Sequence, residues 1–124
     1  MANLKVSQAE SDCLKSMLPI RDALDVISGK WKIMILISIR HQNKRFREIE
    51  RSIPNITSKV LSKELKDLEQ HKLIKRTVYD AYPVMIEYTL TDYAKTLEPV
   101  MNELYSWGLN HRQFILGKAK RTEV

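Results

Sequence analysis

The 124-residue sequence lacks the features that mark several protein classes. Its single cysteine, Cys13, excludes an internal disulfide and any metal site built from several thiolates. Three glycines and four prolines are too few for a loop-dominated or disordered chain. The longest apolar run, Ile33 to Ile37, is far shorter than the roughly 18 apolar residues of a membrane-spanning helix. We expect no membrane association.

The remaining composition is that of a small globular protein. The first five residues, from Met1 to Lys5, lack the apolar region of a signal peptide, so a cytoplasmic location is expected. An apolar fraction of 44% and a charged fraction of 29% are ordinary for globular proteins. The length fits one domain. We expect a polar N-terminal segment over 1–18 with frayed first residues, a domain over 19–118 and a polar tail over 119–124.

The net charge of +6 lies entirely in the middle third of the chain. Between Arg40 and Arg76 there are eleven lysines and arginines and five acids, whereas the rest of the chain is balanced. A field concentrated in this way attracts polyanions, and nucleic acid is the usual one. A surplus that only keeps the protein in solution remains the alternative.

The pattern of apolar residues predicts mostly helices. An amphipathic helix is expected from Pro19, which suits a first turn, to a stop at Gly29. The segment Trp31–Ile39 is apolar nearly all round, so its periodicity fits a buried strand or a buried helix. The elements that follow favour a helix.

Two more helices and a hairpin are predicted next. Arg45–Ser52 forms two turns, and Thr57 can cap a helix from Ser58 to about His71. Residues 74–79 and 84–90 alternate as two strands. Thr91 can cap a last helix that reaches about Lys118, with a kink or a fresh start at Pro99. Three helices before a hairpin form the winged helix-turn-helix arrangement, a mainly α fold with a small β-hairpin.

The Ser58–His71 helix carries a cationic face opposite its leucines. At 100° per residue, its basic, hydroxyl and amide side chains form one arc; they are Lys59, Ser62, Lys63, Lys66 and Gln70. Glu64 and Asp67 lie off this arc, and Glu69 lies at its edge. Such a face suits the major groove of DNA, but an ordinary solvated helix face is an equal alternative.

Residues outside this arc add to the candidate DNA surface. Arg45 and Arg47 at the start of the short helix suit phosphates, as do the free N–H groups near Ser58. The hairpin, with Tyr82 and Pro83 at its tip, either presses on DNA or only covers the core. The candidate DNA-binding residues are Arg45, Arg47, Thr57, Ser58, Lys59, Ser62, Lys63, Lys66, Gln70, Lys75, Arg76 and Tyr79.

An enzyme is not expected, because the usual catalytic motifs are missing. The histidines His41, His71 and His111 are 30 and 40 residues apart, and there is no glycine-rich phosphate loop or nucleophile elbow. No metal or cofactor is expected either. The remaining alternatives to a DNA-binding regulator are a winged-helix protein–protein module and an RNA-binding module.

The last predicted helix carries an apolar stripe longer than one small core can cover. Its members are Leu97, Met101, Leu104, Trp107, Gly108, His111 and Ile115. Gly108 would let another backbone come close. A helix–helix contact in a homodimer, helped by the segment before Pro19, is one use of the stripe, and packing onto its own domain is the other.

Several separated segments resemble the HxlR-type regulators. They are residues 23–31, 45–49, 56–62 and 83–91 and the pair Trp107–Gly108, and the similarity spans Pro19 to His111. The resemblance implies a dimeric winged helix-turn-helix protein that binds double-stranded DNA, with the Ser58–His71 helix in the major groove and the hairpin at Lys75–Tyr88 as the wing. It also implies that the dimer forms through the N- and C-terminal helices.

The sequence departs from this family at one position. Many members have a cysteine directly before the proline that starts the first helix, and in some it is a redox switch. Leu18 stands there in this chain, and the thiol lies five residues earlier at Cys13. Cys13 is either a displaced sensor, which the nearby Lys15 would help to ionise, or an incidental thiol.

Overall fold

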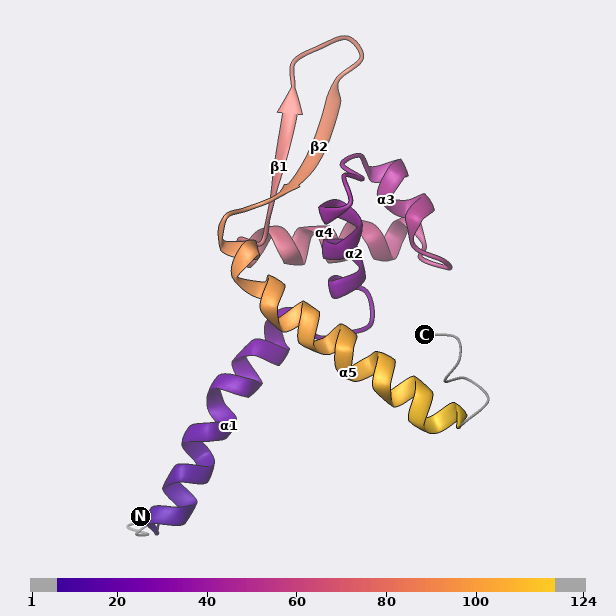
Figure 1. The fold of residues 1–124 in the computed structure, drawn as a ribbon. Coiled ribbons are helices and arrows are strands. Elements are labelled where there is room, and N and C mark those ends of the chain that lie inside the picture. Colours follow the sequence, from indigo (N-terminus) through magenta and orange to yellow (C-terminus); the bar gives the residue numbers. More distant parts are fainter. Residues whose placement is uncertain (1–6, 118–124) are drawn as a thin grey trace.

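The computed structural model describes residues 7–117 and shows a mainly helical chain with one hairpin (Figure 1). In chain order the elements are α1 Gln8–Ile27, α2 Lys32–Arg40, α3 Phe46–Ser52, α4 Ser58–Gln70, β1 Ile74–Tyr79, β2 Met85–Leu90, the 3₁₀ helix η1 Tyr93–Leu97 and α5 Glu98–Leu116. The predicted winged helix-turn-helix arrangement is confirmed: α2 to α4 are the three helices, and β1 and β2 are the wing.

The predicted start of the first helix at Pro19 is wrong. Helix α1 begins at Gln8, where the Ser7 hydroxyl accepts a hydrogen bond from the Glu10 N–H at 3.1 Å and the Glu10 carboxylate accepts one from the Ser7 N–H at 3.0 Å. This capping box satisfies two of the free donors at the helix start. Residues 8–18 are therefore helical, and Pro19 lies inside the helix. The first six residues and the tail from 118 lie outside the described part of the chain.

Helix α1 extends away from the rest of the domain (Figure 1). None of its residues is buried, and it approaches the core only near its end, where Val26 packs against the cluster. It stops after Ile27, and Gly29 has a φ of +84°, the left-handed conformation that glycine adopts without strain. The predicted stop at Gly29 is thus confirmed.

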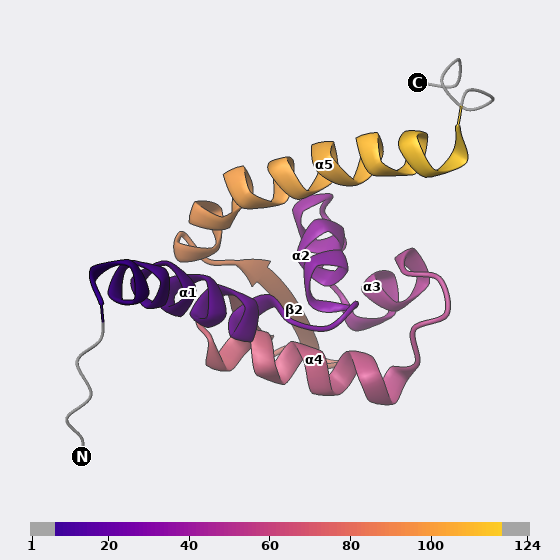
Figure 2. The same ribbon diagram turned by 90° about the horizontal axis from the view of Figure 1, so that it is seen from below.

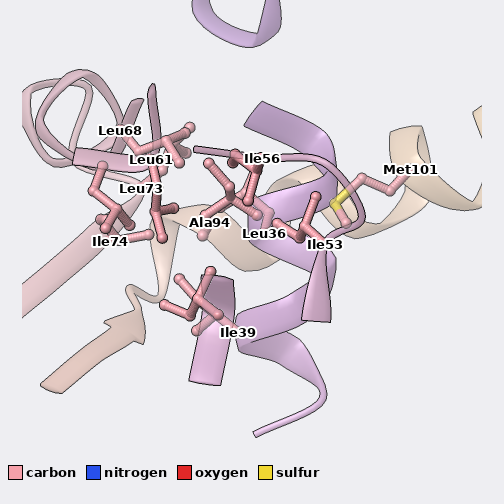
Figure 3. Packing of buried hydrophobic residues seen from close by; sticks show 13 residues of the cluster. Leu36, Ile39, Ile53, Ile56, Leu61, Leu68, Leu73, Ile74, Ala94 and Met101 are labelled. Carbon is pink, nitrogen blue, oxygen red and sulfur yellow. The ribbon is translucent and has the colours of Figure 1, made fainter. Parts of the chain in front are cut away.

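The core joins α2, α4 and the base of the hairpin (Figure 3). The ambiguous segment around residues 31–39 is a helix, and it buries Ile35, Leu36 and Ile39. Helix α4 contributes its predicted stripe, in which Leu61, Leu65 and Leu68 are almost fully buried. Burial of apolar side chains on both helices fixes their relative orientation.

The hairpin is antiparallel, with Ile74 opposite Leu90 and Tyr79 opposite Met85. Only Ile74 of its twelve strand residues is buried, so the strands project from the domain (Figure 1). The Tyr88 N–H donates to the Lys44 carbonyl at 2.8 Å. This bond ties the wing to the loop before α3.

The C-terminal helix starts afresh after a short 3₁₀ turn. The Thr91 hydroxyl accepts from the Ala94 N–H at 3.1 Å and donates to the Lys72 carbonyl at 2.7 Å, which confirms Thr91 as a cap. Pro99 lies in the first turn of α5, where proline is well tolerated. The helix ends at Leu116, close to the predicted end. Of the helices within residues 7–117, none combines the length and the apolar character needed to cross a membrane.

Candidate nucleic-acid interface

Helix α4 is held firmly at its start and along one side. The Thr57 side-chain oxygen accepts from the Val60 N–H at 3.1 Å, as the sequence predicts for an N-cap. The relative exposure of Leu61, Leu65 and Leu68 is 2% or less. The opposite side of the helix therefore faces solvent in a fixed orientation.

The solvent side of α4 forms a shallow hollow of about 410 Å³. It is lined by Lys59, Ser62, Lys63, Lys66, Asp67 and Gln70. Five of these six are the arc predicted from helical periodicity, and we call these five the cationic face. The structure brings them together, and all except the half-buried Ser62 are exposed. The sixth, Asp67, is a correction: the sequence placed it off this face.

A buried cation explains the position of Asp67. Lys32 on α2 is only 7% exposed, and its ammonium lies 2.6 Å from Glu64 Oε1 and 3.6 Å from Asp67 Oδ2. Asp67 Oδ2 also lies 3.3 Å from the ammonium of Lys63, which is well exposed. Local sequence patterns do not reveal the role of Lys32, because its ion pair joins residues 32 positions apart. A lysine among apolar neighbours in the α2 pattern is the one signal that pointed to it.

These contacts set the ionisation of two carboxylates. The hydrogen bond from Lys63, together with the charges of Lys63 and Lys32, lowers the pKa of Asp67 below its usual value despite partial desolvation. Hydrogen bonds from the backbone N–H groups of Arg45 and Lys44 lower the pKa of Glu48 in the same way. Both carboxylates are therefore ionised at neutral pH.

The residues between α3 and α4 are partly engaged by the protein itself. The Ser58 hydroxyl donates to the Glu50 carboxylate, which links the two helices. A phosphate contact from Ser58 would therefore use its backbone N–H, because the hydroxyl proton is already donated to Glu50. Arg45 and Arg47 are exposed at the start of α3. The Arg45 guanidinium lies 3.1 Å from the Met85 sulfur, so Arg45 sits beside the wing and not beside the hollow.

The wing presents the residues that the sequence predicts. Lys75, Arg76 and Tyr79 are all exposed on β1. At the tip, Tyr82 is fully exposed, with a relative exposure of 103%. These side chains are available for contact, and their role in DNA binding stays a prediction.

The predicted dimer stripe on α5 is divided between two surroundings. Met101 is 6% exposed and packs into the core of its own domain, so its assignment to a dimer contact is wrong (Figure 3). Leu97 is half-buried against the same core. The rest of the stripe lies outside the core, and its exposed members are Leu104, Trp107, His111 and Ile115. The rings of Trp107 and His111 stack with their centroids 4.9 Å apart.

Two further features of the terminal helices bear on the dimer prediction. A Cβ added at Gly108 meets no atom within 4 Å in the described part of the chain, so a second backbone has room to approach there. Helix α1, now known to begin at Gln8, exposes Leu14, Met17 and Leu24. Most of the stability of a helix in a protein comes from packing of its apolar face, and α1 has no buried residue within its own chain.

Across residues 7–117, no three histidine, cysteine or acidic side chains gather as a metal site. Cys13 is exposed on α1. Nothing tests a redox role for it, and that interpretation stays a prediction.

The arrangement of the helices separates the two candidate surfaces. Seen from below, α4 lies along one side of the domain and α5 along the opposite side, with α2 and α3 between them (Figure 2). Because the leucines of α4 point into the core, the cationic face points away from α5. The same domain can therefore bind along α4 while a second chain packs on α5.

Comparison with known proteins identifies the family of the chain. A family model described as HxlR-like helix-turn-helix matches residues 26–114. The HTH-type transcriptional regulator YtcD of Bacillus subtilis is 40% identical over 103 residues, which cover 83% of this chain and 82% of YtcD. The reduced form of the redox regulator HypR superposes with a TM-score of 0.74 at 37% identity, covering 78% of this chain and 96% of HypR.

A second solved structure has the same fold. The reduced form of the transcriptional regulator YodB from B. subtilis superposes with a TM-score of 0.66 at 33% identity, covering 73% of this chain and 88% of YodB. The resemblance found in the sequence is thereby confirmed. The chain belongs to the HxlR-like helix-turn-helix family of transcriptional regulators.

Proposed function

We propose that this regulator acts as a homodimer that binds a specific, pseudo-palindromic sequence of double-stranded DNA. The observation that carries the proposal is the cationic face of α4. It is exposed, anchored from behind by three buried leucines, and directed away from α5 (Figure 2). A rigid helix with lysines and an amide on its free side suits the major groove.

The exposed apolar surface of the terminal helices supports the dimer. Trp107 and Phe114 on α5 are 69% and 82% exposed, and Met17 on α1 is 56% exposed. Large apolar side chains left exposed along helices are typical of an interface between chains. A two-fold dimer would present two α4 helices about one DNA turn apart, roughly 34 Å. That spacing accounts for a pseudo-palindromic site.

Binding to duplex DNA at increasing salt concentration tests the proposal. Operators selected from a random duplex library would be titrated by fluorescence anisotropy. We expect affinity to fall steeply with salt, because lysine–phosphate contacts release counterions. Lys66→Glu should abolish operator binding, and Lys63→Glu should do the same, while the melting temperature stays close to that of the wild type.

A matched control comes from the other side of the domain. Lys95→Glu makes the same change of charge on η1, next to α5, at a side chain that is also well exposed. It should bind the operator nearly as the wild type does. If the wild type fails to bind any duplex at low salt, or if Lys66→Glu binds normally, the assignment of α4 is wrong. An acidic protein partner would then be the better hypothesis.

A further inference from the structure

The hollow on α4 contains one acid, Asp67, beside the cationic face, and this acid is held between two lysines. Its Oδ2 lies 3.3 Å from the exposed ammonium of Lys63 and 3.6 Å from the buried ammonium of Lys32. The side chain of Asp67 is one-third exposed, so it is open to the hollow that it lines. The protein thus presents a donor and an acceptor side by side on the surface proposed to meet DNA.

A carboxylate in this place is a disadvantage for binding that depends on phosphates alone. It repels phosphate oxygens, and it competes with them for the Lys63 ammonium. A surface built only for non-specific binding gains nothing from Asp67. The buried Lys32 accounts for the position of Asp67, and the exposure of this carboxylate to the hollow suits an acceptor that meets a hydrogen-bond donor when the correct sequence is bound.

The donors that an α-helix meets in the major groove are amino groups of bases. An ionised carboxylate only accepts hydrogen bonds, and an ammonium only donates them. In a G·C pair the cytosine N4 amino group is the donor, and guanine O6 and N7 are neighbouring acceptors. O6 and N4 are hydrogen-bonded to each other, so they are about 3 Å apart. The Lys63–Asp67 separation of 3.3 Å matches that spacing.

We propose that Asp67 and Lys63 together read one G·C pair, with Asp67 accepting from cytosine N4 and Lys63 donating to guanine O6 or N7. This inference rests on the proposed function, since it requires α4 to lie in the major groove. G·C is favoured over A·T because it offers the ammonium two adjacent acceptors. In A·T the adenine amino group separates the two acceptors, and the thymine methyl group lies beside one of them.

Lys32 is the positioning residue of this pair. It lies beneath α4, where it holds Glu64 at 2.6 Å and Asp67 at 3.6 Å. Its charge fixes the carboxylate of Asp67 from the core side and leaves Lys63 to approach from the solvent side. Glu64 is the closer partner of the Lys32 ammonium, and Asp67 is only its second partner. Asp67 therefore keeps acceptor lone pairs for a base.

The test compares the sequences selected by three forms of the full chain from a random duplex library. The forms are the wild type, Asp67→Asn and the matched control Glu69→Gln, which removes one negative charge from an exposed position two residues further along α4. We expect each wild-type half-site to contain a required G·C pair. In Asp67→Asn the preference for that pair should fall at least about fivefold, the low end of what one good side-chain contact contributes.

Asp67→Asn should change the base preference, whereas Glu69→Gln should not. Asparagine both donates and accepts, and it suits adenine N6 and N7, so Asp67→Asn should admit A·T at that position. It should also bind random duplex at least as tightly as the wild type, because a repulsive charge is gone. Glu69→Gln should keep the wild-type sequence preference. Circular dichroism would confirm that each variant is folded.

A modified operator tests the same contact without changing the protein. Replacing the required cytosine by 2-pyrimidinone deoxynucleoside removes only the 4-amino group. The wild type should lose at least about fivefold in affinity, and Asp67→Asn should lose much less. An unchanged preference in Asp67→Asn, a required A·T pair, or indifference to the missing amino group would overturn the inference. If the wild type binds no duplex at all, the proposed function itself fails.

Discussion

Replacing Lys32 by methionine should destabilise the protein because it leaves two carboxylates without their buried partner. The side chains of Lys32 and Glu64 are 8% and 13% exposed, so their pair is largely shielded from water. Breaking a fully buried ion pair from one side costs about 3–5 kcal/mol. Glu64 and Asp67 keep some access to water, so we expect a loss of about 2–3 kcal/mol in the free energy of unfolding.

A double-mutant cycle separates the ion pair from other effects of the substitution. Glu64→Gln alone should also destabilise the protein, since it leaves the Lys32 ammonium with Asp67 as its only partner, at 3.6 Å. The double variant Lys32→Met, Glu64→Gln should be more stable than the sum of the two losses predicts, by at least about 1 kcal/mol. Methionine has a similar length and is apolar, so it suits the site beneath α4.

Urea denaturation followed by circular dichroism would measure all four proteins at one protein concentration, since the proposed dimer would make their stability depend on concentration. A parallel cycle on Lys63 and Asp67 is the control, because Lys63 is 71% exposed and such pairs contribute about 0–1 kcal/mol. Losses for the Lys32–Glu64 cycle that add to within about 0.5 kcal/mol would refute the coupling.

Three further outcomes are expected. Leu65→Ala, at a side chain that is 2% exposed, should lower the free energy of unfolding by about 2–5 kcal/mol in urea melts. The same leucine-to-alanine change at an exposed position should have little effect. Folding lowers the pKa of Asp67, so the contribution of this carboxylate to stability is complete above its unfolded pKa near 3.8 and is lost as the pH falls through the lower folded pKa. In urea melts from pH 7 to pH 2, the midpoint urea concentration should therefore decrease once the pH is below about 4, and it should decrease less in Asp67→Asn. Trp107→Ala, at a side chain that is 69% exposed, should weaken self-association in sedimentation equilibrium while leaving the fold intact, and an unchanged association constant would remove α5 from the interface.

Much of the fold follows from local signals that the sequence states directly. Thr57 and Thr91 precede helical patterns and cap them as expected. The leucine stripe of α4 predicts the buried side of the helix, and the cationic face lies on the opposite side. These features depend on residues within one or two helical turns, so a periodicity argument captures them.

Two predictions that failed are the start of α1 and the place of Met101 in a dimer contact. A proline near the start of an apolar pattern resembles a first turn, but the capping box formed by Ser7 and Glu10 starts α1 at Gln8, about three turns before Pro19. The sequence contained this signal. The burial of Met101 could not be found in this way, because it depends on where α5 crosses the core (Figure 3). A stripe along a helix does not reveal which of its turns meets its own domain.

Asp67 shows most clearly why a helical projection is insufficient for a binding face. The projection assigns each side chain the direction of its Cβ atom, and by that measure Asp67 belongs beside the face and not on it. Its carboxylate is drawn toward Lys63, one turn earlier on the same side. Lys32 contacts it from the core, and this contact comes from α2, the helix whose secondary structure the sequence left ambiguous. The composition of the binding face therefore depends on a buried charge in another element, and a protein with the same α4 sequence but an apolar residue at position 32 should present its lysines differently to DNA.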